Sequence, residues 1–95
     1  PVSQSGSPSP TPQANAATVT ISNFIFNPSI VTVKRGDSVV WINTDSAPHT
    51  INSAKFNSLA LSQGAKFQFT FIEKGTFDYM CGIHPYMKGK IIVSE

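Results

Sequence analysis

From residue 18 onward the chain is built from short runs in which apolar and polar residues alternate. A period of two places successive side chains on opposite faces and is typical of half-buried β-strands. The run over residues 66–71 alternates most regularly and places Phe67, Phe69 and Phe71 on one face. No stretch shows a helical period long enough to compete with this pattern, so the sequence predicts an all-β protein.

The strands that this pattern predicts are separated by turn signals such as Asn27-Pro28. They occupy residues 18–26, 30–33, 38–43, 49–52, 66–71, 76–81 and 90–93. The run over 38–43 is apolar on both faces, so we expect it to be central in a sheet. The longest irregular connection spans residues 53–65. Seven to eight short strands with closely spaced turns predict a β-sandwich.

Residues 1–17 have a different composition from the rest of the chain. They contain four prolines, four serines and only one apolar side chain larger than alanine. Such a segment cannot bury enough apolar surface to fold. We therefore predict a disordered Pro/Ser-rich linker over residues 1–17, suited to tethering, and one folded domain over residues 18–95.

Composition excludes some classes of function. Seven Lys/Arg and five Asp/Glu give a net charge of +2, and the basic residues are scattered along the chain without interleaved aromatic residues. This distribution argues against nucleic-acid binding. No apolar run reaches the length that a membrane span needs, so any attachment to a membrane would be through the linker.

The sequence Cys81-Gly82-Ile83-His84-Pro85-Tyr86-Met87 carries three metal donors at the spacing Cys-x2-His-x2-Met. Thiolate and thioether are soft ligands, and imidazole suits copper among other metals. Two imidazoles and one thiolate in a trigonal set, with a weak axial Met, describe a blue-copper electron-transfer site. The second imidazole must come from His49, the only other histidine. The predicted ligands are thus His49, Cys81, His84 and Met87.

Each donor also has an ordinary structural interpretation. Taken alone, Cys81 would be a small buried apolar residue, His84 a surface residue and Met87 part of the core. Their regular spacing favours a metal site over three coincidences. Structural zinc prefers four Cys or His ligands, and a thioether is a poor substitute, so copper fits this set better than zinc does.

Strand geometry indicates how His49 would reach the loop that carries the other donors. Phe77, Tyr79 and Cys81 share one face of their strand, so the thiol would point inward at the strand's end. His49 begins an earlier strand, and two strand ends can meet at one edge of a sandwich. Pro85 restricts its own φ and that of the preceding residue, which would stiffen the loop.

Longer segments carry a resemblance to a known family. They are residues 23–28 (NFIFNP), 31–37 (VTVKRGD), 40–43 (VWIN), 48–50 (PHT) and 75–89 (GTFDYMCGIHPYMKG). Together they resemble the cupredoxins, the type 1 blue copper proteins, and in particular the amicyanin/plastocyanin-like branch. The short Cys-x2-His-x2-Met loop is similar to that of amicyanins.

The resemblance implies an eight-stranded Greek-key sandwich (the cupredoxin fold). It implies one type 1 copper held by His49, Cys81 and His84, with Met87 axial. It also implies a monomeric one-electron carrier, periplasmic or otherwise extracytoplasmic, either soluble or tethered to a membrane. The family often has Asn after its first ligand. Thr50 stands there in this chain, and Ser58 is the partner we expect for it.

A cupredoxin-like carrier would exchange electrons through the exposed edge of the second imidazole, here His84. We expect an apolar patch around that edge, formed by Pro48, Ile83, Pro85 and Tyr86. A small apolar patch suits the brief docking of redox partner proteins.

Three other functions compete with this interpretation. A plain β-sandwich interaction domain is disfavoured only because the spacing of the donors is so regular. A copper oxidase or nitrite reductase needs further copper centres rich in histidine, and the chain has two histidines in all, so we do not expect an enzyme. A copper-binding or copper-trafficking module without a carrier role would use the same ligands. The exchange of copper with chelators distinguishes that module from a carrier.

Overall fold

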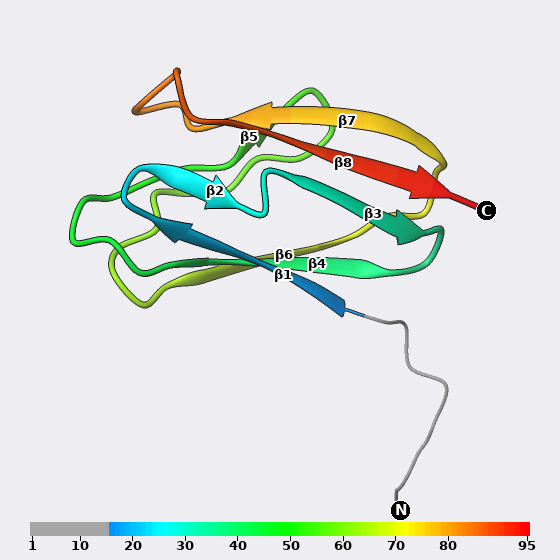
Figure 1. Ribbon diagram of the computed structural model, residues 1–95, viewed down its shortest axis with the longest axis horizontal. Coiled ribbons are helices and arrows are strands. Elements are labelled where there is room, and N and C mark those ends of the chain that lie inside the picture. The colour runs from blue at the N-terminus through cyan, green and yellow to red at the C-terminus, as the bar shows by residue number, and fades with distance from the viewer. Residues whose placement is uncertain (1–15) are drawn as a thin grey trace, which may run out of the picture.

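A computed structural model describes residues 16–95, which form eight β-strands and no helix (Figure 1). The strands are β1 (Ala16–Ser22), β2 (Ile25–Asn27), β3 (Ile30–Lys34), β4 (Ser38–Asn43), β5 (Asn52–Ser53), β6 (Lys66–Thr70), β7 (Gly75–Met80) and β8 (Lys88–Ser94). Most of the predicted linker, residues 1–15, lies outside the described residues. Its last two positions, Ala16 and Ala17, belong to β1.

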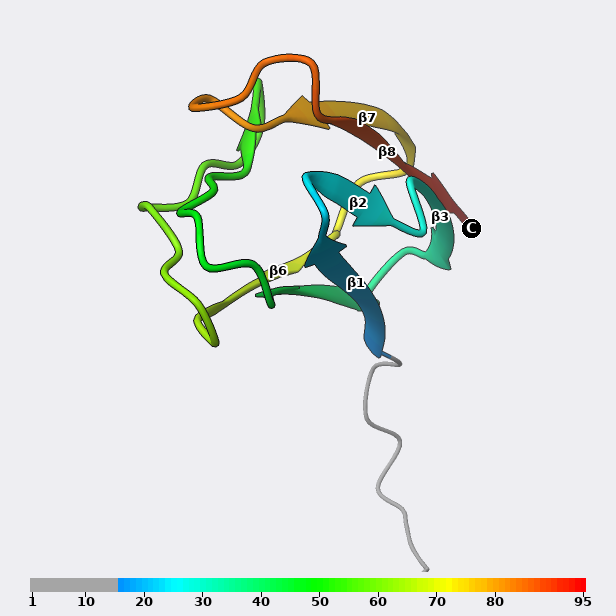
Figure 2. The ribbon, with the colours of Figure 1, turned by 60° about the vertical axis from the view of Figure 1, so that its left-hand side comes forward.

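The strands form two four-stranded sheets that face each other, as Figure 2 shows. One sheet has the order β2-β1-β4-β6 and the other the order β3-β8-β7-β5. The pairs β1–β4 and β3–β8 are parallel, and the other pairs are antiparallel. Strand β4 lies inside its sheet, between β1 and β6, as its two-sided apolar pattern predicts. The predicted all-β sandwich of seven to eight strands is confirmed.

Two of the predicted strands differ from the observed ones. The run over residues 18–26 is divided between β1 and β2, because Asn23 and Phe24 adopt φ angles of 55° and 60°, in the left-handed region. Such turns usually carry a glycine, and its absence concealed the turn in the sequence. The run over residues 49–52 is also broken, since His49 forms only an isolated bridge with Leu61 before the short strand β5.

The core between the sheets is aromatic. Trp41 on β4 is fully buried, and its ring lies 5.6 Å from those of Phe56 and Phe67 and 5.4 Å from that of Tyr79. Phe69 and Phe71 pack against Phe56 from β6 and the residue that follows it. Large aromatic side chains bury much area each, so this cluster joins the two sheets and fixes the inward face of β7.

Tyr79 places a hydroxyl in this core that has no hydrogen-bond partner among residues 16–95. An unpaired buried polar group costs about 1–3 kcal/mol. We therefore expect Tyr79→Phe to raise the free energy of unfolding by about 1 kcal/mol. Denaturant titration at neutral pH measures this difference, and a loss of stability would show that the hydroxyl is satisfied in solution.

The same residue predicts how stability falls at alkaline pH. Burial raises the pKa of Tyr79 to about 12, above the value of about 10 in an unfolded chain. The stability that the protein gains by keeping this phenol neutral is fully present below pH 10 and is lost as the pH rises through 12. As the pH rises from 10 to 12, the free energy of unfolding should therefore fall less in Tyr79→Phe than in the wild type. Denaturant unfolding curves recorded at several pH values in this range measure the difference.

The loops at one end of the sandwich hold the residues of the predicted metal site. The turn between β1 and β2, the segment after β4 and the β7–β8 loop all lie at this end (Figure 1). Strand β1 begins toward the opposite end, where the carboxyl terminus also lies. Within residues 16–95 there is no helix that is long and apolar enough to cross a membrane.

Candidate metal centre

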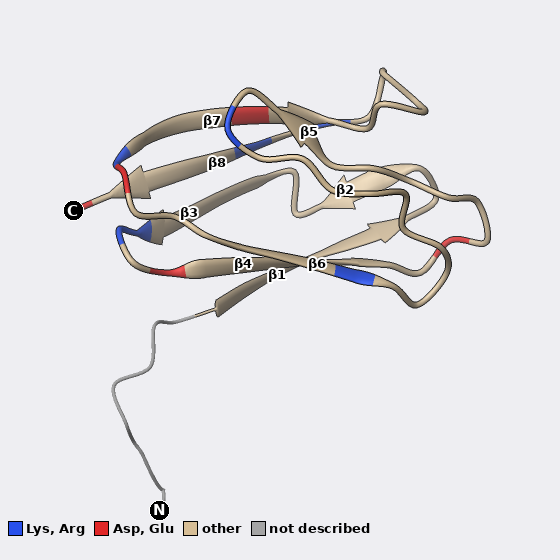
Figure 3. Cartoon of the chain, turned by 180° about the vertical axis from the view of Figure 1, so that it is seen from behind, with Lys and Arg blue, Asp and Glu red and all other residues tan. Residues whose placement is uncertain are grey.

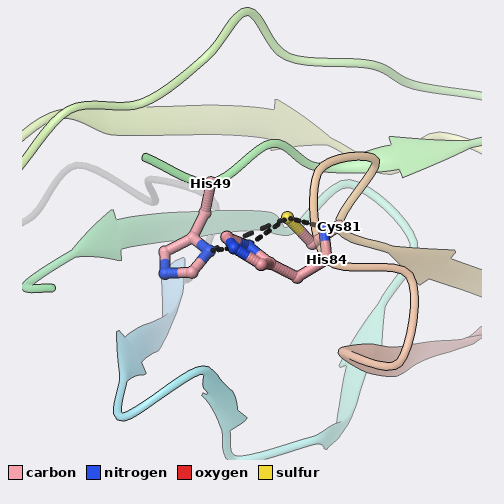
Figure 4. A group of neighbouring side chains, drawn as sticks. All are labelled: His49, Cys81 and His84. Atoms are coloured by element: carbon pink, nitrogen blue, oxygen red, sulfur yellow. Dashed lines mark hydrogen bonds between the residues drawn. The ribbon is translucent and has the colours of Figure 1, made fainter. Parts of the chain in front are cut away.

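Three of the four predicted ligands come together at this end of the sandwich. The side chains of His49, Cys81 and His84 converge, with their ligand atoms all within 4.8 Å of one another (Figure 4). Cys81 Sγ lies 3.7 Å from His49 Nδ1 and 3.8 Å from His84 Nδ1. The two Nδ1 atoms are 3.2 Å apart. Residues from two distant parts of the sequence thus present one sulfur and two nitrogens to a common point.

These three distances suit a trigonal metal ion. A point equidistant from the three atoms is about 2.1 Å from each. Metal–imidazole bonds are about 2.0–2.1 Å long and zinc–thiolate bonds about 2.3 Å. An ion would therefore fit among the three donors with little rearrangement, and the residues present fit a bound metal.

Local structure of the β7–β8 loop explains how Cys81 and His84 are presented. Cys81 directly follows β7, and its amide donates to the carbonyl of Met87 at 3.0 Å, while the Met87 amide donates to the carbonyl of His84 at 2.9 Å. These two bonds close the loop on itself. They leave His84 half-buried at the surface and Met87 buried, with 2% of the residue exposed. The thioether of Met87 is thus enclosed on the side of the core.

Hydrogen bonds fix the backbone of His49 and the segment that precedes it. Its amide donates to the carbonyl of Leu61 at 3.2 Å, and the Leu61 amide donates back at 2.7 Å. The fully buried Asn43 fixes the segment before it, since its side-chain amide donates to the carbonyls of Ala47 and Leu61 at 2.9 and 2.7 Å. The histidine therefore enters the site on a braced segment rather than on a regular strand.

Sequence reasoning missed Asp45. Its Oδ2 lies 2.9 Å from Nε2 of His49, the ring nitrogen opposite the one that faces the site. Its two carboxylate oxygens also accept hydrogen bonds from the amides of Asn23 and Phe24, at 2.7 and 3.0 Å. Desolvation raises the pKa of this carboxyl group, but the bonds from Phe24, Asn23 and His49 outweigh it and lower the pKa below its usual value. The only signal in the sequence is an Asp four residues before a His.

Phe24 was missed as well, because its turn was read as part of a strand. Its ring lies edge-on to both imidazoles, with centroids 5.3 Å from His49 and 5.0 Å from His84. Phe24 is 39% exposed, so its ring covers the imidazoles from the solvent side. No local sequence pattern indicates this contact, which depends on the packing of the β1–β2 turn over the site.

The thiol of Cys81 is prepared to act as a ligand. Burial of the side chain raises its pKa, but hydrogen bonds from the amides of Thr50 and His84, together with the contacts to the ring nitrogens of His49 and His84, lower it to about 6. Each of the two amides lies 3.4 Å from the sulfur. The thiolate, the form that binds metals, is therefore the main form at neutral pH.

Thr50 joins the two ligand-bearing segments. Its hydroxyl accepts a hydrogen bond from the amide of Gly82 at 2.7 Å and donates to Oδ1 of Asn52 at 2.6 Å. A Cβ on Gly82 would lie 2.6 Å from that Asn52 oxygen, so glycine is required here for the close approach. The expected Thr50–Ser58 pair is wrong. Ser58 instead accepts from the amide of Ile51, at 2.9 Å, because Thr50 turns toward the β7–β8 loop.

Charge is sparse at this end of the molecule. The loop over residues 81–87 contains no Lys, Arg, Asp or Glu, and the loops at this end are mostly tan in Figure 3, with little red or blue. Ile83 and Tyr86 are 45% and 69% exposed, and Pro48 and Pro85 are also exposed. The surface around the His84 ring is therefore largely apolar.

Comparisons with known proteins agree with this geometry. A family model described as a cupredoxin-like domain matches residues 3–93. Amicyanin from Paracoccus versutus is 33% identical over 84% of the chain. The copper(I) form of an amicyanin point mutant superposes with a TM-score of 0.81 at 32% identity, covering 84% of this chain and 83% of that one. A purple cupredoxin from Nitrosopumilus maritimus gives a TM-score of 0.76 at 31% identity, covering 82% and 99%.

The match to the curated amicyanins is not a match to their whole length. The chain spans 66% of the Paracoccus versutus protein and 65% of that from Paracoccus denitrificans. The family is nevertheless established, because the family model covers nearly the entire chain and the relatives exceed 30% identity. The two-sheet fold, the converging sulfur and imidazoles and these matches lead to one conclusion: the chain belongs to the cupredoxin family.

Proposed function

We propose that this protein is a one-electron carrier with a single type 1 copper site. His49, Cys81 and His84 would hold the copper, and Met87 would supply the thioether. The observation that carries the proposal is the trigonal arrangement of one sulfur and two Nδ1 atoms, 3.2 to 3.8 Å apart. The donor set of blue-copper electron-transfer sites consists of two imidazoles, one thiolate and a weak thioether.

Copper would supply the change between Cu(I) and Cu(II), and the chain's residues would hold one geometry for both states. The His49 ring is fixed by Asp45 and by the paired backbone of Leu61. The loop with Cys81 and His84 is fixed by its own hydrogen bonds and by Thr50. A rigid set of donors rearranges little on electron transfer, and that favours fast exchange.

We assign electron entry and exit to the exposed edge of the His84 ring. His84 is half-buried, whereas His49 and Cys81 are fully buried. Tyr86 lies beside its ring, with centroids 6.1 Å apart, and Ile83, Pro48 and Pro85 complete the apolar surface. Redox proteins dock through small interfaces, and this patch matches that requirement.

A positive charge in the patch should slow electron exchange without altering the copper site. We expect Tyr86→Lys to slow electron self-exchange by about tenfold or more, because two like charges meet when two copies dock through their patches. NMR line broadening in mixtures of the reduced and oxidised proteins measures this rate. Ile72→Lys is the matched control, since Ile72 is 74% exposed and lies at the opposite end of the sandwich. Equal rates in the two variants would contradict docking at the patch.

Retention of copper tests the carrier role against a trafficking role. A carrier keeps Cu(I) in the presence of a competing chelator and shows a reversible one-electron wave in voltammetry. A trafficking module yields Cu(I) readily to the chelator. The buried His49 and the closed loop favour retention. Rapid loss of Cu(I) to a chelator such as bathocuproine disulfonate would overturn the carrier assignment.

The setting of the protein follows from the same assignment. We propose an extracytoplasmic location, with residues 1–15 as a linker that permits tethering. Strand β1 begins toward the end of the sandwich opposite the site (Figure 1), so a tether would leave the His84 patch free to dock. We do not propose catalysis by this chain, since its two histidines are both used by one centre.

A further inference from the structure

The carboxylate of Asp45 connects two features that pack on the metal site. It contacts Nε2 of the buried His49 ring and accepts from the consecutive amides of Asn23 and Phe24. Its side chain is 14% exposed, and that of His49 is fully buried. The contact is therefore largely shielded from water, where a charged hydrogen bond is stronger than at the surface.

The contact with His49 determines which nitrogen of the ring carries the proton. A carboxylate accepts hydrogen bonds, so Nε2 must be the protonated nitrogen and Nδ1 the one with a free lone pair. Nδ1 is the atom that faces Cys81 and His84. Histidines that bind metals commonly donate their other N–H to a carboxylate, which fixes both tautomer and ring orientation.

The contact with the β1–β2 turn explains an unusual backbone. Phe24 has a φ of 60°, a region that costs a non-glycine residue free energy and that type I′ turns usually fill with glycine. Strained residues persist where the surroundings hold them and often mark functional sites. Here Asp45 binds the amides of the turn, and the ring of Phe24 lies against both imidazoles.

We propose that Asp45 is a positioning residue for the metal centre. It holds His49 with Nδ1 directed at the donors, and it holds the 23–24 turn so that Phe24 covers both imidazoles. Its charge also favours the more positive oxidation state of a bound ion and lowers the reduction potential. The inference rests on the proposed copper site for its effect on potential, whereas its effect on the His49 ring belongs to the metal-free protein.

The first test uses the metal-free protein at alkaline pH, where imidazoles are neutral. Nitrogen-15 chemical shifts report the tautomer of each histidine ring. The wild type should show His49 protonated at Nε2, and Asp45→Ala should show a mixture of both tautomers. Asp78→Asn is the charge-matched control, because Asp78 is exposed on β7, and it should resemble the wild type. An unchanged tautomer in Asp45→Ala would overturn the inference.

The second test loads the same variants with copper. Asp45→Ala should weaken copper binding by about 10–100-fold, the usual effect of removing a partner of a ligand. Asp45→Asn keeps one acceptor oxygen and should retain most of the affinity, yet its potential should rise because the charge is lost. If Asp45→Asn had the same reduction potential as Asp78→Asn, the proposed effect of the Asp45 charge on the potential would be overturned.

Two further outcomes are distinguishable. If Asp45→Ala does not fold, Asp45→Asn carries the test, and an unchanged potential together with unchanged affinity overturns the inference. If the wild type binds copper without thiolate colour, the proposed function fails. A tautomer that depends on Asp45 would still support the positioning role in that case.

Discussion

Asn43→Asp is expected to lower the free energy of unfolding by about 3 kcal/mol or more. The side-chain amide of Asn43 donates to the carbonyls of Ala47 and Leu61, and its oxygen accepts from the amide of Asp45 at 2.8 Å. A carboxylate of the same shape would face two carbonyl oxygens without a proton to donate. Because Asn43 is fully buried, water cannot compensate for either loss.

Denaturant titration measures the loss, and Asn57→Asp is the matched control. Asn57 is exposed, and its Oδ1 only accepts a bond, from the side-chain amide of Asn52, so an aspartate can replace it. The control should remain within about 0.5 kcal/mol of the wild type, as surface substitutions usually do. Similar stabilities for the two variants would show that Asn43 does not brace the segment before His49.

Gly89→Ala is the second substitution from which we expect a large loss, about 3 kcal/mol, at the upper end of overpacking costs. Gly89 lies opposite Tyr79 in the β7–β8 pair. A Cβ at this position would lie 2.7 Å from Cε1 of Tyr79 and closer still to Cζ and the hydroxyl. The tyrosine ring is buried among Phe26, Trp41 and Phe56, so the added methyl group would push it out of its packed position.

A double-mutant cycle checks this explanation. Tyr79→Val alone removes the ring and leaves a cavity, which costs stability. If the Gly89→Ala methyl group clashes with the tyrosine ring, the double variant should lose less free energy of unfolding than the two single variants lose together. Strictly additive losses would mean that the cost of Gly89→Ala arises elsewhere.

The fold was predictable because its signal is local. Period-two alternation located β4 at residues 38–43 and β6 to within one residue at its end. The same pattern placed Tyr79 and Cys81 inward. The β1–β2 turn was not predictable, because Asn23 and Phe24 adopt left-handed backbone without a glycine to signal it. Its conformation is held by Asp45, a residue about twenty positions away.

The candidate site divides in the same way. The spacing of Cys81, His84 and Met87 is local, and His49 followed by elimination because no other histidine exists. The contacts of Asp45 and Phe24 with the imidazoles depend on how three loops pack together, which no periodic pattern encodes. The tie from Thr50 to Gly82 likewise depends on the meeting of two segments 32 positions apart.

Titration of the metal-free protein with Cu(II), followed in the visible spectrum, tests the central claim most directly. A type 1 site predicts an intense blue or green band that saturates at one copper per chain and is absent in Cys81→Ser. That result would establish bonding between copper and the Cys81 thiolate. Colourless binding, or a band that survives in Cys81→Ser, would contradict the assignment of Cys81 as a ligand and the carrier function with it.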